Sequence, residues 1–163
     1  IHEAQEAPNR GLDHGAWVVL KHLFPAADVP VFQLSIDHRK PMEYHFALAG
    51  RLRQLRGQGV LFVGSGNIVH NLELASLEAG ALPYDWAVEF DGWVAERIIR
   101  RDFGSLVHYA TLGPGVAAEL SVPDVDHYVP LLYALALAGP GEEIRFTYEE
   151  VVSSISMRCL RIG

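Results

Sequence analysis

The sequence predicts an α/β fold in three layers (αβα), with helices on both faces of a mixed, largely parallel central sheet. Apolar, β-branched runs at 29–36 and 60–66 alternate with amphipathic stretches at 13–24 and 41–59, and this alternation is typical of parallel sheets. Half of the 163 residues are apolar, which is enough to bury one core of ordinary size. We therefore expect a single domain over residues 1–163.

Local signals place the individual elements. The stretch at 41–59 begins with a proline suited to a first helical turn and ends at glycines. The apolar run at 128–139 would be about 18 Å long as a helix, too short to span a bilayer, so it predicts a buried helix. In chain order we expect helices at 13–24, 41–59, 67–80, 85–101 and 128–139, and strands at 29–36, 60–66 and 155–163.

Charge and composition exclude several classes of partner. The chain has 20 acidic and 13 basic residues, for a formal charge of -7, and the basic residues are scattered rather than clustered. We therefore expect no nucleic-acid partner. The first 15 residues lack the apolar core of an export signal, and we expect no membrane association. Cys159 is the only cysteine, which suits a reducing cytoplasm.

The stretch VGSGNIVHN, residues 63–71, places a histidine just after a predicted strand. Ligands in open α/β sheets bind beyond the carboxyl ends of strands. Gly64 and Gly66 would let the backbone turn and approach a ligand, and Asn67 would cap a helix with His70 in its first turn. The alternative is that a strand-to-helix turn simply favours Gly, Ser and Asn, with His70 an ordinary polar residue.

The same stretch does not match the common glycine-rich motifs. GSGNIV lacks the third glycine of a dinucleotide-binding loop, and Val63 replaces the first glycine of a G-x-S-x-G elbow. No Lys-Ser or Lys-Thr pair follows the glycines, which excludes a P-loop.

Two further histidines, His14 in GLDHGAW and His127 in VDHYVPLL, stand where a loop becomes a predicted helix. An aspartate precedes each of them and could cap the helix or accept a hydrogen bond, and apolar residues follow. His22, His38 and His45 lie among charges or within an amphipathic stretch, and we expect them to be solvated or structural. For His108, in LVHYATLG, both interpretations stay open: it could line the pocket or be structural.

Taken together, residues 10–71 and the segment DHYVPLLYALALAG resemble the class III extradiol ring-cleaving dioxygenases of the DOPA 4,5-dioxygenase type, the LigB-like superfamily. Three separated histidine motifs in the same order carry the resemblance. It implies a non-haem Fe(II) or Zn(II) bound by His70 and His127, with His14 as the acid/base histidine; His70 could instead be a base beside the metal. Neutral imidazole nitrogens bind either metal at about 2.0–2.2 Å.

The resemblance also implies that the substrates are a DOPA-like catechol and O2, which would meet on the metal. Two alternatives stay open: a zinc-binding relative that is hydrolytic or non-catalytic, and an α/β binding module with no metal. Metal identity separates ring cleavage from the first alternative, because zinc has no redox chemistry.

Length is the main departure from this family. Its members carry an N-terminal portion with two further metal-binding histidines, whereas this sequence begins just before GLDHGAW. We expect the chain to be the C-terminal part of a longer dioxygenase domain, and two imidazoles alone would form an incomplete site. It should then expose apolar surface that binds the missing N-terminal segment or drives self-association.

Overall fold

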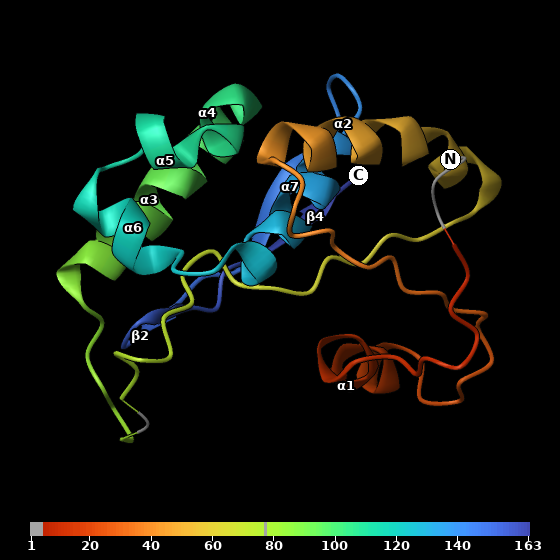
Figure 1. The fold of residues 1–163 in the computed structure, drawn as a ribbon, viewed down its shortest axis with the longest axis horizontal. Helices are drawn as coiled ribbons and strands as arrows, with labels where there is room; N and C mark the ends of the chain where they lie inside the picture. The colour runs from red at the N-terminus through yellow and green to blue at the C-terminus, as the bar shows by residue number, and fades with distance from the viewer. Residues whose placement is uncertain (1–4, 77) are drawn as a thin grey trace. The chain divides into compact units, whose positions relative to one another are not determined.

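The structure, a computed structural model, describes residues 5–76 and 78–163 (Figure 1). The chain divides into two compact units, one ending at Ser35 and the other running from Ile36 to Gly163. Each unit is described by itself below. Within the described ranges, no helix combines the length and apolarity needed to cross a bilayer.

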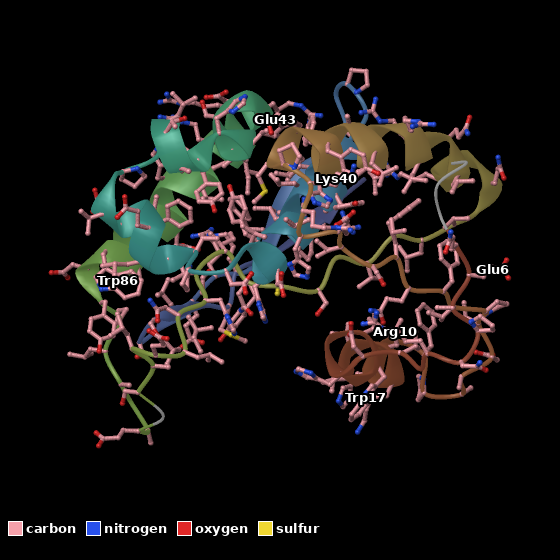
Figure 2. All side chains as sticks on the ribbon, viewed as in Figure 1. Glu6, Arg10, Trp17, Lys40, Glu43 and Trp86 are labelled. Atoms are coloured by element: carbon pink, nitrogen blue, oxygen red, sulfur yellow. The ribbon has the colours of Figure 1, made fainter. Side chains whose placement is uncertain are left out.

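Among residues 5–35, the first unit has one helix, α1 (His14–Leu23), which confirms the helix predicted at 13–24. Asp13 is its N-cap, because its carboxylate accepts a hydrogen bond from the Ala16 amide at 2.9 Å. No residue of α1 is buried, and Trp17 projects outward from the helix with 46% of its surface exposed (Figure 2). The prediction of a strand at 29–36 is wrong: these residues lie in neither a helix nor a strand, and Phe32 is 73% exposed.

The second unit is built around two main helices, α3 (Asp85–Ile99) and α7 (Val129–Ala136), which confirm the helices predicted at 85–101 and 128–139. The stretch at 41–59 forms α2 (Met42–Leu52) followed by the 3-10 helix η1 (Arg53–Gln58). The shorter helices are α4 (Phe103–Val107), α5 (Tyr109–Leu112), α6 (Val116–Ser121) and the 3-10 helix η2 (Val125–His127).

The core of this unit lies between α3, α7 and the short helices. Phe90 and Ile98 of α3 are fully buried, as is Leu132 of α7. Tyr128 is also buried, and its hydroxyl donates a hydrogen bond to the Leu106 carbonyl at 3.0 Å. Burying these large side chains gives about 1.5–3 kcal/mol each, which fixes α7 and the turn before it.

Two small antiparallel sheets complete the second unit. β1 (Ile144–Tyr148) pairs with β4 (Cys159–Ile162), and β2 (Val151–Val152) pairs with β3 (Ile155–Ser156). The strand predicted at 155–163 is therefore present in two pieces. The chain mixes helices and strands as predicted, but no parallel strand pair, and so no three-layer arrangement on a parallel sheet, occurs among the described residues.

The prediction of a strand at 60–66 is wrong: these residues lie in neither a helix nor a strand. Strand propensity is a local property, whereas a ladder needs a neighbour that presents matching N–H and C=O groups. The sequence pattern shows strand propensity but does not identify a neighbouring strand.

The helix predicted at 67–80 is wrong: residues 67–76 and 78–80 form turns and irregular structure, and Leu77 lies outside the described residues. Its backbone groups bond elsewhere instead. The Val69 carbonyl accepts from Ser156 at 3.0 Å, and the Asn71 amide donates to Ser154 at 3.2 Å. Because these partners lie on and beside β3, the groups that would close a helix are already in use.

Candidate functional site

The second unit brings His70 and His127 together. Their imidazole rings are stacked, with centroids 3.6 Å apart and planes 8° from parallel. Both side chains are half-buried, and neither ring has an ion pair or hydrogen bond to another described residue. Two of the three predicted site residues therefore form one cluster.

His70 is held in place by backbone hydrogen bonds on two sides. Its own amide donates to the Ser121 carbonyl at 2.9 Å, at the end of α6. On the other side it forms an isolated antiparallel bridge with Ile155 of β3. The prediction that Asn67 caps a helix is wrong, because no helix begins there; its side-chain amide donates to the Ser156 carbonyl at 2.6 Å.

The two glycines explain how the His70 segment reaches the His127 segment. A Cβ at Gly66 would lie 2.2 Å from the His127 carbonyl oxygen, and one at Gly64 would lie 2.8 Å from that of Pro130. The Asn67 amide then donates to the His127 carbonyl at 2.9 Å. Both glycines are thus points of close approach to another backbone segment.

Burial lowers the pKa of His70 below its usual range, and the nearby His127 imidazole lowers it further. At neutral pH the His70 ring is therefore neutral and keeps a free lone pair, the form that binds a metal. This chemistry suits Fe(II) or Zn(II), but two imidazoles are only part of a donor set. Among the described residues, neither histidine lies in a group of three His, Cys, Asp or Glu side chains whose ligand atoms converge.

His14 lies in the first unit, at the first position of α1, and is exposed. The Asp13 carboxylate before it caps the helix and also accepts a hydrogen bond from the Gln33 side-chain amide. No hydrogen bond between the side chains of Asp13 and His14 occurs in the described structure, so Asp13 serves the backbone rather than the imidazole.

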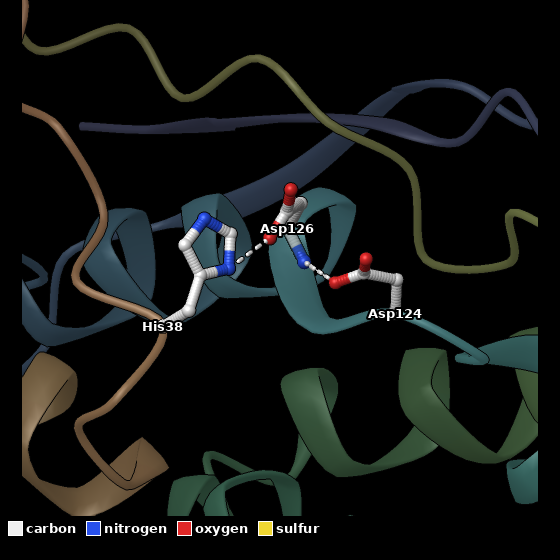
Figure 3. Close-up of side chains that lie close together, drawn as sticks. All are labelled: His38, Asp124 and Asp126. Atoms are coloured by element: carbon white, nitrogen blue, oxygen red, sulfur yellow. Dashed lines mark hydrogen bonds and ion pairs between the residues drawn. The ribbon is translucent and has the colours of Figure 1, made fainter.

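A second cluster, His38, Asp124 and Asp126, was missed by sequence reasoning (Figure 3). His38 Nδ1 lies 2.7 Å from Asp126 Oδ1, and the ligand atoms of all three side chains lie within 4.8 Å of one another. Asp124, not Asp126, caps η2, since it accepts from the Asp126 amide at 3.3 Å. The acidic pair in PDVD was the only available signal. Exposed groups of this kind are common without a cation.

The other histidines have structural or surface positions. His45 on α2 is buried; its Nδ1 lies 3.1 Å from the Tyr133 hydroxyl, and its Nε2 has no hydrogen-bond partner among the described residues. Burial lowers the pKa of His45. His108 lies 3.3 Å from Glu43 on the surface, and His22 is exposed.

Comparison with known proteins identifies the scaffold that carries these histidines. The model of the family described as "Catalytic LigB subunit of aromatic ring-opening dioxygenase" matches residues 1–154. The chain belongs to the LigB family.

Individual LigB relatives agree with this assignment. The chain is 38% identical over 157 residues to a 4,5-DOPA dioxygenase extradiol of Escherichia coli K12, covering 94% of this chain and 57% of the relative. It is 34% identical over 140 residues to a protein of the same name from Portulaca grandiflora, covering 85% and 51%. The chain thus spans about half the length of the curated relatives it matches.

A solved structure agrees with the fold of this LigB chain. The crystal structure of an uncharacterized protein from Escherichia coli K12 superimposes with a TM-score of 0.85 at 37% sequence identity. The match covers 98% of this chain and 65% of that one. Both histidine motifs of the second unit lie within the residues that match the LigB family.

Proposed function

We propose that this LigB chain is part of a non-haem, metal-dependent extradiol dioxygenase that cleaves the ring of a DOPA-like catechol with O2. The observation that carries the proposal is the stacked pair of half-buried imidazoles, His70 and His127, on a LigB scaffold. The relatives named 4,5-DOPA dioxygenase extradiol support the same reaction class and substrate.

In this proposal His70 and His127 supply two metal ligands. His70 and His127 would hold Fe(II), which would supply the redox chemistry for opening a catechol ring with O2; zinc would not supply it. The lowered pKa of His70 keeps its lone pair available at neutral pH. The backbone hydrogen bond of His70 to Ser121 and its bridge to Ile155 hold the main chain that carries the ring.

His14 is proposed to move protons rather than to bind the metal. It is preceded by the capping residue Asp13 and followed by Gly15, so its imidazole stands at the exposed start of α1. A neutral imidazole has one ring nitrogen that can accept a proton, which suits a group that takes a proton from a catechol hydroxyl.

We also propose that residues 1–163 form a single domain that is the C-terminal part of a longer dioxygenase domain. Two imidazoles are only part of a metal donor set, which fits this proposal. The remaining ligands, and the strands of a three-layer αβα fold with a largely parallel sheet, would come from the part of LigB proteins outside the match. The lone Cys159 is compatible with a cytoplasmic protein.

Metal titration of single variants tests the proposed ligands. Co²⁺ or Zn²⁺ is titrated into the 163-residue chain at pH 7.5 under argon, and binding is followed by Co²⁺ absorption and calorimetry. His127→Ala and His70→Ala should each weaken binding by at least about 10-fold, because each removes a ligand. His108→Ala, the matched control, removes an exposed histidine and should bind like the parent. Unchanged affinity in His127→Ala would refute the assignment.

Ring cleavage is tested separately on iron-loaded, full-length protein. Oxygen uptake that depends on DOPA, together with a ring-opened product by mass spectrometry, is expected. A protein that retains only zinc and consumes no oxygen after iron loading would favour the zinc-binding alternative.

A further inference from the structure

The buried polar side chains of the second unit gather around His70. Among the described residues, and apart from His45, they are Asn71, Asp91, Ser121, Ser153, Ser154 and Ser156. Asn71 follows His70 in the chain, the Ser121 carbonyl accepts from the His70 amide, and the last three serines lie on or beside β3. A buried polar group lowers stability unless hydrogen bonds compensate for its lost hydration. Asp91 is the one carboxylate in this set, and the proposed metal chemistry does not use it.

The main chain on both sides of His70 is held by β3 and the turn before it. The Ser156 amide donates to the Val69 carbonyl at 3.0 Å, and the Asn71 amide donates to the Ser154 carbonyl at 3.2 Å. The Ser154 hydroxyl donates to the Asn71 carbonyl at 2.5 Å. However, β3 has only two residues, and so does β2, with which it pairs. Because so short a ribbon is not stable alone, the position of β3 depends on what else it contacts.

Asp91 joins β3 to the long helix α3. One of its carboxylate oxygens accepts from the Ser156 hydroxyl at 2.6 Å, and the other accepts from Nη2 of Arg158 at 2.6 Å. The side chains of Asp91 and Arg158 are only 6% and 10% exposed, and the Arg158 guanidinium also lies 4.6 Å from the centre of the Phe146 ring. A single buried carboxylate therefore binds the residues on both sides of Met157.

We propose that Asp91 is a positioning residue for His70, which acts through the Ser156 hydroxyl and β3 on the main chain that carries the imidazole. The connection is short: one side-chain hydrogen bond, followed by the backbone bonds between β3 and the His70 segment. It sets the position from which the His70 ring stacks on that of His127. The consequence for metal binding rests on the proposed function, whereas the consequence for stacking does not.

The alternative is that Asp91 only balances the buried charge of Arg158. Removing either partner of a buried ion pair leaves an uncompensated charge and lowers stability, whatever happens at His70. Two substitutions separate these roles. Ser156→Ala removes the hydroxyl that links Asp91 to β3 and leaves the ion pair in place. Asp91→Asn removes the negative charge but keeps an oxygen that accepts from Ser156.

Proton NMR of the histidine rings in the metal-free 163-residue chain measures the stacking, because each imidazole shields the ring protons of the other. The signals are assigned with His70→Ala and His127→Ala. In Ser156→Ala, both sets of signals should move toward those of an unstacked ring, with little loss of thermal stability. In Asp91→Asn, the signals should stay close to those of the parent while thermal stability falls, because Arg158 loses its partner.

Co²⁺ titration of the same proteins measures the consequence for the proposed metal site. Affinity should fall at least about threefold in Ser156→Ala, because residues that position a ligand affect metal binding. Asp91→Asn should bind like the parent. The matched control is Ser105→Ala, which removes another 2.6 Å hydrogen bond from a serine hydroxyl to an aspartate, at the start of α4. This control should change neither the histidine signals nor the affinity.

Unchanged histidine signals in Ser156→Ala would overturn the proposal. Signals that move in proportion to lost stability across Ser156→Ala, Asp91→Asn and Arg158→Met would also overturn it, because Asp91 would then only stabilise the fold. A parent chain that binds no Co²⁺, with signals that still move in Ser156→Ala alone, would confirm the positioning role and refute the proposed metal ligands. If Ser156→Ala fails to fold, Ser156→Cys takes its place, because a thiol is only a weak donor.

Discussion

The two regions that carry the proposed histidines are built in opposite ways. In the second unit, the hydrogen bond that the His70 amide donates to the Ser121 carbonyl and the bridge to Ile155 hold the backbone at His70, and two glycines bring this segment against that of His127. In the first unit, α1 carries His14 without a single buried residue. A ligand pair needs fixed geometry, whereas a proton-transfer group needs access to substrate, so this difference matches the roles proposed for them.

The largest effect is expected for His14 of the first unit, on the rate of the proposed ring cleavage. In iron-loaded, full-length protein, His14→Phe should keep its metal and still bind a catechol. Ring cleavage should slow by roughly 10²- to 10⁴-fold, about 3–5 kcal/mol in the barrier, because a placed imidazole contributes that much to proton transfer. The pH profile of turnover should also lose one limb. Steady-state oxygen uptake across pH measures both.

The same variant can contradict this role in two ways. Near-normal turnover per folded molecule, with lower thermal stability, would mean that Asp13 and His14 only start α1. Iron lost together with the side chain would make His14 a ligand. His22→Phe, on the last turn of the same helix, controls for a bulky ring on α1.

The close approach of the backbones in the second unit should be sensitive to one methyl group. Gly66→Ala places a Cβ 2.2 Å from the His127 carbonyl oxygen, so the two segments must separate. We expect a loss of about 3 kcal/mol in the free energy of unfolding, measured by urea denaturation, together with weaker Co²⁺ binding.

Gly92→Ala is the matched control for this prediction. Gly92 lies within α3, is exposed, and a Cβ there would meet nothing within 4 Å. This substitution should be neutral or stabilise the protein by up to about 1 kcal/mol, because alanine favours helix. Equal stabilities for the two variants would show that the approach at Gly66 does not matter.

Gly64 and Gly66 also show how much of the structure the sequence could predict. The α1, α3 and α7 helices were predictable because caps and apolar periodicity are local properties. The glycines marked a close approach, but nothing local could reveal that the facing group would be the His127 carbonyl. The same limit applies to the stretch 67–80, predicted to be a helix, whose backbone bonds to residues on and beside β3.

The candidate site was predictable to a similar extent. His70 and His127 were identified from their motifs and a family resemblance, and the structure brings them into contact. His38 and Asp126 were not, because an ion pair between residues so distant in sequence leaves no local pattern. Strand pairing failed for the same reason, since it depends on partners outside the local sequence.

A third prediction concerns His45, a buried histidine of the second unit, and the pH dependence of stability. Burial lowers the pKa of His45 in the folded chain below the ordinary value of 6.5. At a pH between the folded and the unfolded pKa, the unfolded chain therefore binds more protons than the folded chain. Stability should therefore rise with pH through this window and fall as pH drops below about 6.5. One proton gives a slope of at most about 1.4 kcal/mol per pH unit.

His45→Gln should flatten that slope while leaving a polar group near the Tyr133 hydroxyl. Urea denaturation at several pH values between about 5 and 7 measures the slope in both proteins. His22→Gln, at an exposed position, should keep the slope of the parent. An unchanged slope in His45→Gln would assign the pH dependence to other groups.

The smallest effect is expected at the cap of α1, and it distinguishes structure from chemistry in the first unit. The Asp13 carboxylate accepts from the Ala16 amide at 2.9 Å, and α1 has no buried side chain to hold it otherwise. Asp13→Ala should cost about 1 kcal/mol, seen as roughly fivefold faster hydrogen exchange at the start of the helix.

Asp13→Asn keeps an acceptor and should preserve the cap, and Asp28→Ala, on an exposed loop of the same unit, should change nothing. If Asp13→Asn leaves exchange unchanged but slows ring cleavage in the iron-loaded, full-length protein, the carboxylate acts on the His14 imidazole as well as on the backbone. If neither quantity changes, the cap is the whole role of Asp13.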